Sequence, residues 1–590
     1  MKYIRIDISK IIYLFTVLAV MTACNKDLGN YDYEDVNTVV IGESREDNGK
    51  VKRGIKEKTS EVGADLFVRP LIDYSAGEDE SLFTYTWYYW SVKDSKWYVL
   101  HEGRNLEIKV AGPIGAPDTN YQLAYEIVNK KTQIPYRELF DLKVNNPLTK
   151  GILALCETED GFDIDQLALS GEGVFTFHKN VLDEVGSDLS RKGAKPYDIV
   201  ASRDRFAPSP YDKEGATFSI NILTDRYTTR ILAKDYSWKP SYDISNFVEN
   251  GSYLDNEYRK KGKPIICEQM KFSYLTDPDP SGTEVKLNTI VYIKDENGQG
   301  NWYLYSTSPL MLLYSNPMNK IRETNPLVGF KPAPFAALGN KGAMYYDTEL
   351  KEFRYQEFTS SLAEGSKKMY YCEKIPDNVD NLGPFKYNAP NEGLLYMGEV
   401  LGGGMPIANY AITGQSDGSF RYIEFETPSN GLPISTKRRV SVFNAGSNIG
   451  NAKFFARIPS SDTHFLYYVT NDNRIYKADM TTADAQVTEI TSDVLPGDGY
   501  TEVTAFKYLL PNSQELSKYD VNKALAVATY NPSLGKNTGG KLEFFMLEDS
   551  ATGKLVRNKF PNKVVEEGKY QIDMSWTGLG RVVGLIYKDR

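Results

Sequence analysis

The chain has 590 residues, a formal net charge of −9 at pH 7, 41% hydrophobic residues and 25% charged residues. This length exceeds what one hydrophobic core supports, so we expect two or more domains, and the balance of hydrophobic and charged residues is typical of a folded protein. The negative charge argues against nucleic-acid binding, which needs a basic face, and the three histidines, His101, His178 and His464, lie too far apart to favour a histidine-rich metal centre.

The N-terminus has the layout of a secretory signal. Three basic residues lie among the first ten, and an apolar run follows from Ile11 to Ala23. Because about 20 apolar residues are needed to span a bilayer, this run is too short for a transmembrane helix and has the length of a signal-peptide core. It ends in Met-Thr-Ala-Cys at Cys24, which resembles the lipobox of bacterial lipoproteins. The resemblance implies that residues 1–23 are a lipoprotein signal peptide and that Cys24 is lipidated; the alternative is ordinary secretory cleavage beside an incidental cysteine.

Residues 24–41 are polar and acidic, and we predict that they form a tether. The Lys-Asp pair soon after Cys24 partly resembles the signal that sends some Gram-negative lipoproteins to the cell surface. We therefore expect a protein anchored in the outer membrane by its lipid and facing the cell surface. Each buried acyl methylene adds about 0.8 kcal/mol to such anchoring. The alternative is a solvated tether without a sorting signal.

The other three cysteines do not form a disulfide pattern. They are odd in number and far apart, and Cys156 and Cys267 lie in apolar, strand-like runs. Buried free thiols are the expected state.

Residues 42–148 show short strands separated by turns. In "LFTYTWYYW" the odd-numbered positions, among them Trp87, are all aromatic, whereas Thr84 and Thr86 share the other face with Tyr88 and Trp90. About 100 residues with a central strand tryptophan and no cysteine pair indicate an N-terminal Ig/PKD-like β-sandwich, with Trp87 in its core.

Residues 149–590 repeat one theme, a hairpin with a polar turn between aromatic-rich strands. Examples are "TIVYIKDENGQGNWYLYS" and "HFLYYVTNDNRIYKADM". Hairpins that recur over this length, with few amphipathic helices, predict a β-propeller of about seven blades, with six or eight as alternatives. The fold class is therefore all-β, and a string of β-sandwiches is the competing architecture.

The layout resembles one known family. The segments "CNKDLGNYDYEDVNTVVI", "YTWYYW" and "KGILALCETEDG" are similar to the PKD-like family of bacterial lipoproteins, most specifically in the acidic tyrosine segment Asn30–Glu34. The resemblance implies a lipid anchor, a PKD/Ig-like module and a propeller-like C-terminal region. It also implies SusC/SusD-type outer-membrane importers as partners, and an accessory role in the uptake of oligomeric peptides or glycans.

One aromatic group is a candidate ligand-binding site. Trp90 and Trp97 flank the turn "SVKDSK", and pairing of the two strands brings Tyr88, Trp90 and Trp97 together away from the core. Exposed aromatic rings can stack on sugars or clamp peptides. We favour the alternative that these rings pack against the propeller or a partner subunit.

One acidic turn is a candidate metal site, and no other cofactor is expected. The segment "DPDPSGTEVKLN" places Asp277, Asp279 and Ser281 at alternating positions and Asn288 at the twelfth, which is similar to a structural calcium loop. The bidentate glutamate is absent and two prolines intrude, so a plain acidic turn is favoured.

Three other motifs are weak candidates. "GKNTGGK" (535–541) nearly spells a phosphate loop, but the expected Ser or Thr and helix do not follow. "GQSDG" (414–418) matches a nucleophile elbow, but a strand-like segment follows it. Asp163 and Asp165 share one strand face, a spacing that is common in solvated strands.

We expect a non-enzymatic binding or docking lipoprotein, with the ligand site on the face where the propeller channel opens. The alternative is a propeller enzyme that degrades glycans or peptides, because the fold hosts such enzymes. A pure scaffold is the third hypothesis. Acids, or Arg with Tyr, converging at the channel mouth would favour an enzyme, and an aromatic or flat apolar face would favour binding.

Overall fold

The computed structural model describes residues 37–588, except 78, 117, 170–174, 207–216, 273–287, 296, 307–311, 314–316, 323, 325–327, 339–341, 358–360, 365–366, 376–392, 403–404, 427–436, 459–462, 510–523, 558, 561–571 and 574. The chain divides into two compact units, Met1–Asn146 and Pro147–Arg590.

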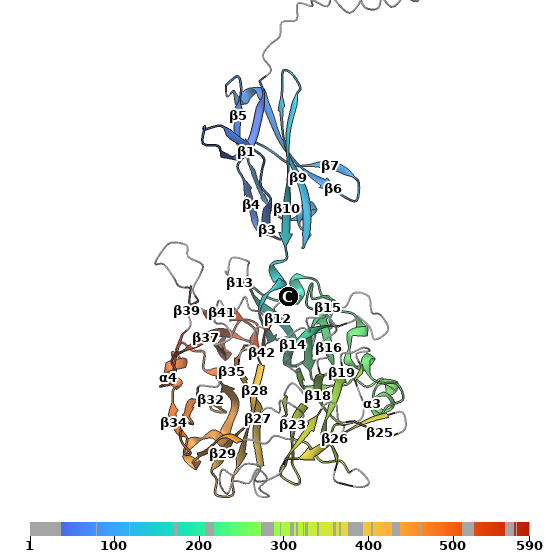
Figure 1. Cartoon of the computed structure of the whole chain (residues 1–590), viewed down its shortest axis with the longest axis vertical. Helices are drawn as coiled ribbons and strands as arrows, with labels where there is room; N and C mark the ends of the chain where they lie inside the picture. The colour runs from blue at the N-terminus through green and yellow to red at the C-terminus, as the bar shows by residue number, and fades with distance from the viewer. Residues whose placement is uncertain are drawn as a thin grey trace, which may run out of the picture. The chain divides into compact units, whose positions relative to one another are not determined.

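The described part of the first unit contains ten strands in three sheets (Figure 1). The largest sheet has the order β3-β10-β9-β6-β7, and the others have the orders β2-β1-β5 and β4-β8. All pairs are antiparallel except β3 with β10. The strands are β1 (Val39–Arg45), β2 (Val51–Arg53), β3 (Lys58–Glu61), β4 (Asp65–Val68), β5 (Leu71–Tyr74), β6 (Phe83–Ser91), β7 (Lys96–Glu102), β8 (Leu106–Lys109), β9 (Thr119–Asn129) and β10 (Pro135–Asn145).

Trp87 is the centre of this unit's core, as its place in the alternating strand predicts. Its side chain is fully buried and stacks on Tyr125 with ring centroids 4.1 Å apart. Phe140 meets it edge-on at 6.1 Å. The indole Nε1 donates a 2.9 Å hydrogen bond to the carbonyl oxygen of Gly103, so its one polar group is satisfied inside the core.

In the second unit, the described strands form seven sheets and one separate two-stranded ribbon. Figure 1 shows the sheets in chain order round a ring, from cyan through green, yellow and orange to red. The strands of the first three sheets are β11 (Gly151–Glu157), β12 (Phe162–Leu169), β13 (Phe175–His178), β14 (Pro196–Phe206), β15 (Thr217–Thr224), β16 (Thr228–Leu232), β17 (Cys267–Phe272), β18 (Asn288–Lys294), β19 (Gly300–Ser306) and β20 (Leu312–Leu313).

The next four sheets have the same antiparallel character, apart from the short parallel pair β21 and β26. Their strands are β21 (Lys320–Ile321), β22 (Ala337–Leu338), β23 (Gly342–Asp347), β24 (Glu352–Glu357), β25 (Ser361–Glu364), β26 (Lys367–Lys374), β27 (Gly393–Gly402), β28 (Met405–Gly414), β29 (Phe420–Glu426), β30 (Lys437–Phe443), β31 (Ala452–Arg457), β32 (Phe465–Thr470), β33 (Ile475–Asp479), β34 (Gln486–Glu489), β35 (Glu502–Tyr508), β36 (Leu525–Tyr530), β37 (Gly540–Asp549), β38 (Lys554–Arg557) and β41 (Ser575–Leu579). The ribbon pairs β39 (Lys559–Phe560) with β40 (Ile572–Asp573).

The ring is closed by the last strand, β42 (Arg581–Lys588). It pairs antiparallel with β11, from Gly151 opposite Lys588 to Glu157 opposite Arg581. Seven clusters of buried apolar side chains each join two neighbouring sheets, and one of them joins the last sheet to the first. Because each sheet is covered on both faces, strands such as β11, β32 and β36 are almost continuously buried. This closed ring of sheets is the arrangement of a β-propeller.

Short helices interrupt the strands. The main insertion, between β16 and β17, contains 3₁₀ turns at Pro240–Tyr242, Ile244–Phe247 and Arg259–Lys261 and the helix α3 (Tyr253–Glu257). Helices α2 (Val181–Glu184) and α4 (Thr491–Val494) are each a single turn. Among the residues described, no helix has the length and apolar character needed to cross a bilayer. The described cysteines, Cys156, Cys267 and Cys372, are buried free thiols.

Candidate functional site

The structure brings the three predicted aromatic residues together on the outward face of the first unit's large sheet. Trp90 on β6 lies directly opposite Trp97 on β7, and their rings meet edge to face with centroids 5.4 Å apart. Tyr88 lies two residues earlier on the same face of β6, opposite Val99. All three rings are half-buried. We call this set, Tyr88, Trp90 and Trp97, the aromatic face.

An ion pair from the neighbouring strands supports the aromatic face. The Arg137 guanidinium lies 5.3 Å from the ring centre of Tyr88 and 5.7 Å from that of Trp97. Its Nε and Nη2 donate to Glu126 Oε2 at 2.9 and 2.6 Å, and the Tyr88 hydroxyl donates to Glu126 Oε1 at 3.2 Å. Burial, and then the Glu126 carboxylate, raise the pKa of Tyr88. These contacts hold the rings in a fixed orientation before any ligand arrives.

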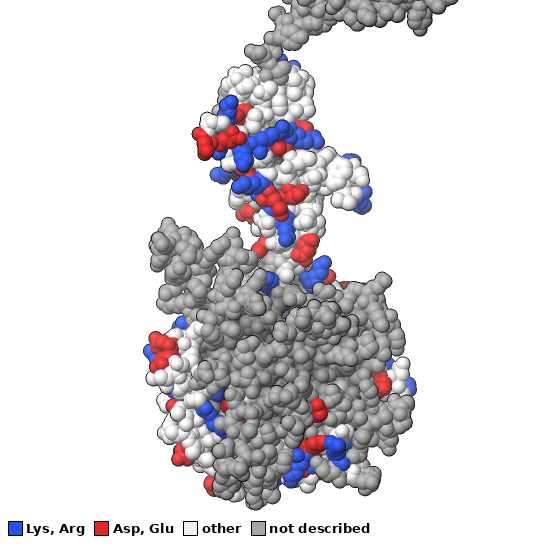
Figure 2. Space-filling model, in the orientation of Figure 1, with Lys and Arg blue, Asp and Glu red and all other residues white. Residues whose placement is uncertain are grey.

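Two exposed apolar side chains adjoin the aromatic face. Val99 is 55% exposed and Leu139 is 49% exposed, and register aligns both with Tyr88 across the sheet through Ala124. Figure 2 shows that the projecting β6–β7 hairpin is mainly uncharged, with basic residues at its end. Flat, half-buried rings beside a paired guanidinium and carboxylate can stack on the apolar face of a sugar, or clamp a peptide side chain, and still offer hydrogen bonds at the edge.

A charged network lies beside the N-terminal ends of β35 and β42, two of the innermost strands of the ring. Arg581, which begins β42, pairs with Glu157 at 2.9 Å and with Glu502, the first residue of β35, at 2.5 Å. Lys536 adds a 2.7 Å pair to Glu157, and the Arg581 guanidinium lies 5.6 Å from the Tyr530 ring. Burial alone would raise the pKa of Glu157, but the hydrogen bonds and positive charges of Lys536 and Arg581 outweigh it and hold that pKa below its usual value.

The two acids on β12 are buried, which corrects the prediction of a solvated pair. Asp163 Oδ1 accepts from the backbone N–H groups of Ile164 and Leu182, and its other oxygen pairs with Arg191. Asp165 accepts from Asn180 N and Gly580 N, both at 2.9 Å. Asp165 therefore helps to hold the closure of the ring in place, since Gly580 directly precedes β42, whereas Asp163 ties β12 to α2 and Arg191.

The two loop motifs are turns. Gly414–Gly418 joins β28 to β29, so Ser416 precedes a strand and lacks the helix that a nucleophile elbow needs. Residues 535–541 lie in the hairpin between β36 and β37, where Lys536 pairs with Glu157. The motif closes the ring and does not form a phosphate loop.

Other predicted residues lie partly or wholly beyond the described structure. Cys24, Asp277, Asp279 and Ser281 are outside the described residues, and Asn288 begins β18. Within the described part of the chain, no three His, Cys, Asp or Glu side chains are grouped as a metal site.

The fold and these surfaces define an all-β protein that pairs an Ig-like module with a propeller-type ring. Residues 24–191 match the model of the PKD-like family, which confirms the predicted PKD-like character of that part of the chain. The match includes the first unit and extends into the second unit as far as β13 and α2.

Among solved structures, the chain is similar to a quinonprotein alcohol dehydrogenase-like protein from Bacteroides thetaiotaomicron VPI-5482, with 13% identity, a TM-score of 0.32, and coverage of 90% of this chain and 97% of that chain. It is also similar to the six-bladed lectin of Aleuria aurantia, with 12% identity, a TM-score of 0.24, and coverage of 63% of this chain and 98% of that chain. A third similar structure is the Cps50 β-propeller domain of Myceliophteria thermophila, with 11% identity, a TM-score of 0.27, and coverage of 61% of this chain and 88% of that chain. No curated protein matches the sequence.

Proposed function

We propose that this chain is a surface-anchored binding lipoprotein that captures an oligomeric glycan or peptide for a SusC/SusD-type importer. The aromatic face carries this proposal. Its two tryptophans and one tyrosine stay half-exposed although a large core is available in the same unit. The Arg137 guanidinium lies against Tyr88 and Trp97, and Trp97 in turn packs on Trp90. Large aromatic residues on a surface are enriched where proteins bind other molecules, because they supply contact area at a low cost in conformational entropy.

In this proposal Cys24 attaches the chain to the outer membrane through its lipid. Each of the seven sheets of the second unit is one blade of a seven-bladed propeller, which serves as the platform for a ligand or a partner protein. The proposal treats one acidic segment as a plain turn, with a structural calcium site as the alternative. The segment contains Asp277, Asp279, Ser281 and Asn288. Chelation followed by a melting experiment distinguishes the two.

The enzyme alternative has one specific observation in its favour, the group of Glu157, Glu502, Arg581 and Tyr530 beside the N-terminal ends of β35 and β42. Its acids, however, are paired with cations. The pKa of Glu157 is lowered, whereas a general acid needs a carboxyl whose pKa is raised towards neutrality. The geometry therefore favours ring closure over catalysis. Cleavage of glycans or peptides that Glu157→Gln abolishes in a folded protein would favour the enzyme.

The proposal makes two measurable claims. A C-terminally tagged chain should co-purify with a SusC/SusD-type importer from detergent-solubilised outer membranes, and Cys24→Ala should remove it from the membrane fraction. The purified Cys24→Ala protein should bind oligosaccharides or oligopeptides, and Trp97→Ala should weaken that binding by about 10-fold or more, the usual effect of truncating an aromatic anchor. Phe67→Ala, which removes an exposed ring (58%) from β4, is the matched control. Purification without an importer, together with no binding to either panel, would refute the proposal.

A further inference from the structure

A small pocket on the second unit lies between the α3 insertion and the β18–β19 hairpin. Figure 1 shows α3 at the outer edge of the ring beside β19. The pocket has a volume of about 260 Å³, and its walls include Tyr253, Tyr258, Tyr303, Asp295, Gln299 and Asn301. This volume is below the roughly 300–1,000 Å³ of sites for drug-sized ligands, so it suits a single ring better than an oligomer.

Three tyrosines form the aromatic wall. Tyr258 and Tyr303 are 9% and 4% exposed and make the floor, whereas Tyr253 is 52% exposed and stands at the entrance. The rings of Tyr253 and Tyr258 meet edge to face at 6.4 Å. Burial raises the pKa of Tyr258 and of Tyr303, and Tyr253 and Asp295 raise both further. The hydroxyls are therefore neutral donors in a pocket that also contains the Asp295 carboxylate.

A carboxylate and an amide form the polar wall. Asp295 Oδ1 accepts from Asn297 N and Gln299 N at 2.9 Å, which closes the hairpin turn. Its second oxygen accepts no hydrogen bond from any described residue. Asn301 Oδ1 accepts from Asn319 Nδ2 at 3.0 Å, so the Asn301 NH₂ group remains as a donor. The pocket thus offers an acceptor and a donor close to an aromatic surface.

The insertion is fixed before any ligand binds. Asp255 is fully buried and accepts from Gly251 N at 2.7 Å, and it pairs with Arg259 and Lys260 at 2.5 and 3.0 Å. The Ser252 hydroxyl caps α3 by accepting from Asp255 N. Leu254 and Tyr258 belong to the same buried cluster as Tyr303. Core contacts of Leu254 and Tyr258 and the ion pairs of Asp255 therefore hold the insertion against the hairpin, and Tyr253 packs on Tyr258.

We propose that this pocket binds one pyranose ring of a saccharide. A sugar ring has an apolar C–H face, which suits the tyrosines, and an edge of neighbouring hydroxyls that both donate and accept. The free Asp295 oxygen accepts from such a diol and the Asn301 amide donates to it. A small organic cation would also suit tyrosines and a carboxylate, but the amide donors of Asn301 and Gln299 present partial positive charge and disfavour it. The site lies on the other unit from the aromatic face and does not depend on it.

The test uses the Cys24→Ala chain with methyl glycosides of glucose, galactose and mannose, followed by saturation-transfer NMR and calorimetry. We expect saturable binding of at least one glycoside with a Kd on the order of millimolar. Tyr253→Ala should weaken it at least 10-fold, because this exposed ring forms the entrance. Tyr197→Ala, which removes a 40% exposed tyrosine from β14, should leave it unchanged.

Three results would overturn the proposal: no glycoside binds, binding survives Tyr253→Ala unchanged, or choline binds in a Tyr253-dependent way and the glycosides do not. Gln299→Ala provides a second variant at an exposed position if Tyr253→Ala is poorly folded, and a several-fold loss is expected from it. Trp97→Ala should leave glycoside binding at this pocket intact. A failure here is therefore distinguishable from a failure of the proposed function, which Trp97→Ala tests.

Discussion

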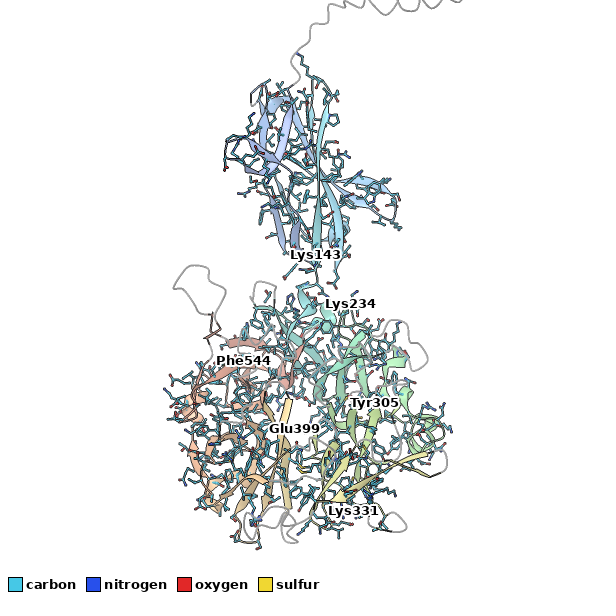
Figure 3. The ribbon with its side chains drawn as sticks, in the orientation of Figure 1. Lys143, Lys234, Tyr305, Lys331, Glu399 and Phe544 are labelled. Atoms are coloured by element: carbon cyan, nitrogen blue, oxygen red, sulfur yellow. The ribbon has the colours of Figure 1, made fainter. Side chains whose placement is uncertain are left out.

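Glu399 joins three of the innermost strands, and replacing it should measurably weaken the ring. Figure 3 labels Glu399 near the middle of the ring. From β27, its Oε1 accepts from Lys271 Nζ on β17 at 2.8 Å and from the backbone N–H of Leu338 on β22 at 2.9 Å. Lys271 also donates to Ala336 O at 2.5 Å. Glu399→Gln keeps the shape and one acceptor for Leu338 but removes the negative charge.

The expected loss follows from the burial of this pair. The side chains of Lys271 and Glu399 are 21% and 17% exposed. A hydrogen bond to a charged group contributes about 1.5–3 kcal/mol, and breaking a fully buried ion pair costs about 3–5 kcal/mol. For a pair that is roughly four-fifths buried, we expect Glu399→Gln to lower the free energy of unfolding by about 2–3 kcal/mol.

Glu268→Gln is the matched control, because it makes the same chemical change on the same group of strands. Glu268 pairs with Lys294 at 2.6 Å, but the side chains are 33% and 43% exposed, so the expected loss is below about 1 kcal/mol. Urea titrations of the wild type and both variants are followed by fluorescence. At a shared m-value, the shift of each midpoint from the wild-type midpoint gives the loss in free energy of unfolding. Losses that agree within about 0.5 kcal/mol would refute the argument from burial.

Three further predictions concern the core, the closure and the thiols. Trp87→Phe should destabilise the first unit by about 2–4 kcal/mol in the same titration, because it opens a cavity and orphans the Gly103 carbonyl, whereas Trp90→Phe should cost less than about 1 kcal/mol. The partners of Glu157 hold its pKa below the unfolded value of 4.5. The contribution of Glu157 to the free energy of unfolding is therefore present above that unfolded pKa and is lost as the pH falls through the folded pKa. Between pH 7 and pH 3 the melting temperature should therefore fall more steeply for the wild type than for Glu157→Gln. Parallel curves of melting temperature against pH would contradict this. In the Cys24→Ala chain, the three buried thiols should not react with a disulfide reagent until the protein is denatured, since burial raises the pKa of Cys267 to about 12; reaction in the folded state would contradict it.

The local patterns in the sequence predicted much of the fold. The hairpins at 289–306 and 464–480 are β18–β19 and β32–β33, because polar turns between alternating or apolar strands are local signals. The closure was not predictable in this way, since Gly151 and Lys588 pair across almost the whole second unit. The insertion that holds α3 was also missed, because its single-turn helices carry no periodic apolar pattern.

The same difference between local patterns and long-range contacts applies to the candidate sites. Alternation on one strand placed Tyr88 and Trp90 on the outward face, and the short turn placed Trp97 beside them. Arg137 and Glu126 come from a different hairpin, and only the order of the strands brings them to Tyr88. The pair Asp163 and Asp165 gave a wrong expectation of exposure, because spacing alone does not show that Leu182 and Arg191 contact the first acid and Gly580 the second.

The strand β42 joins the first and last sheets of the ring. Val582, Leu585 and Tyr587 enter the cluster that joins the last sheet to the first, whereas Val583 and Ile586 pack against the cluster between the first and second sheets. One strand therefore completes two of the seven interfaces. Its register is fixed from both ends, by the pair of Arg581 with Glu157 and by Lys588, whose Nζ donates to Leu148 O at 2.7 Å. Closure of the ring therefore accounts for the pairing of Arg581 with Glu157 and Glu502, and the two proposed binding sites are the aromatic face and the pocket of Tyr253, Tyr258 and Tyr303.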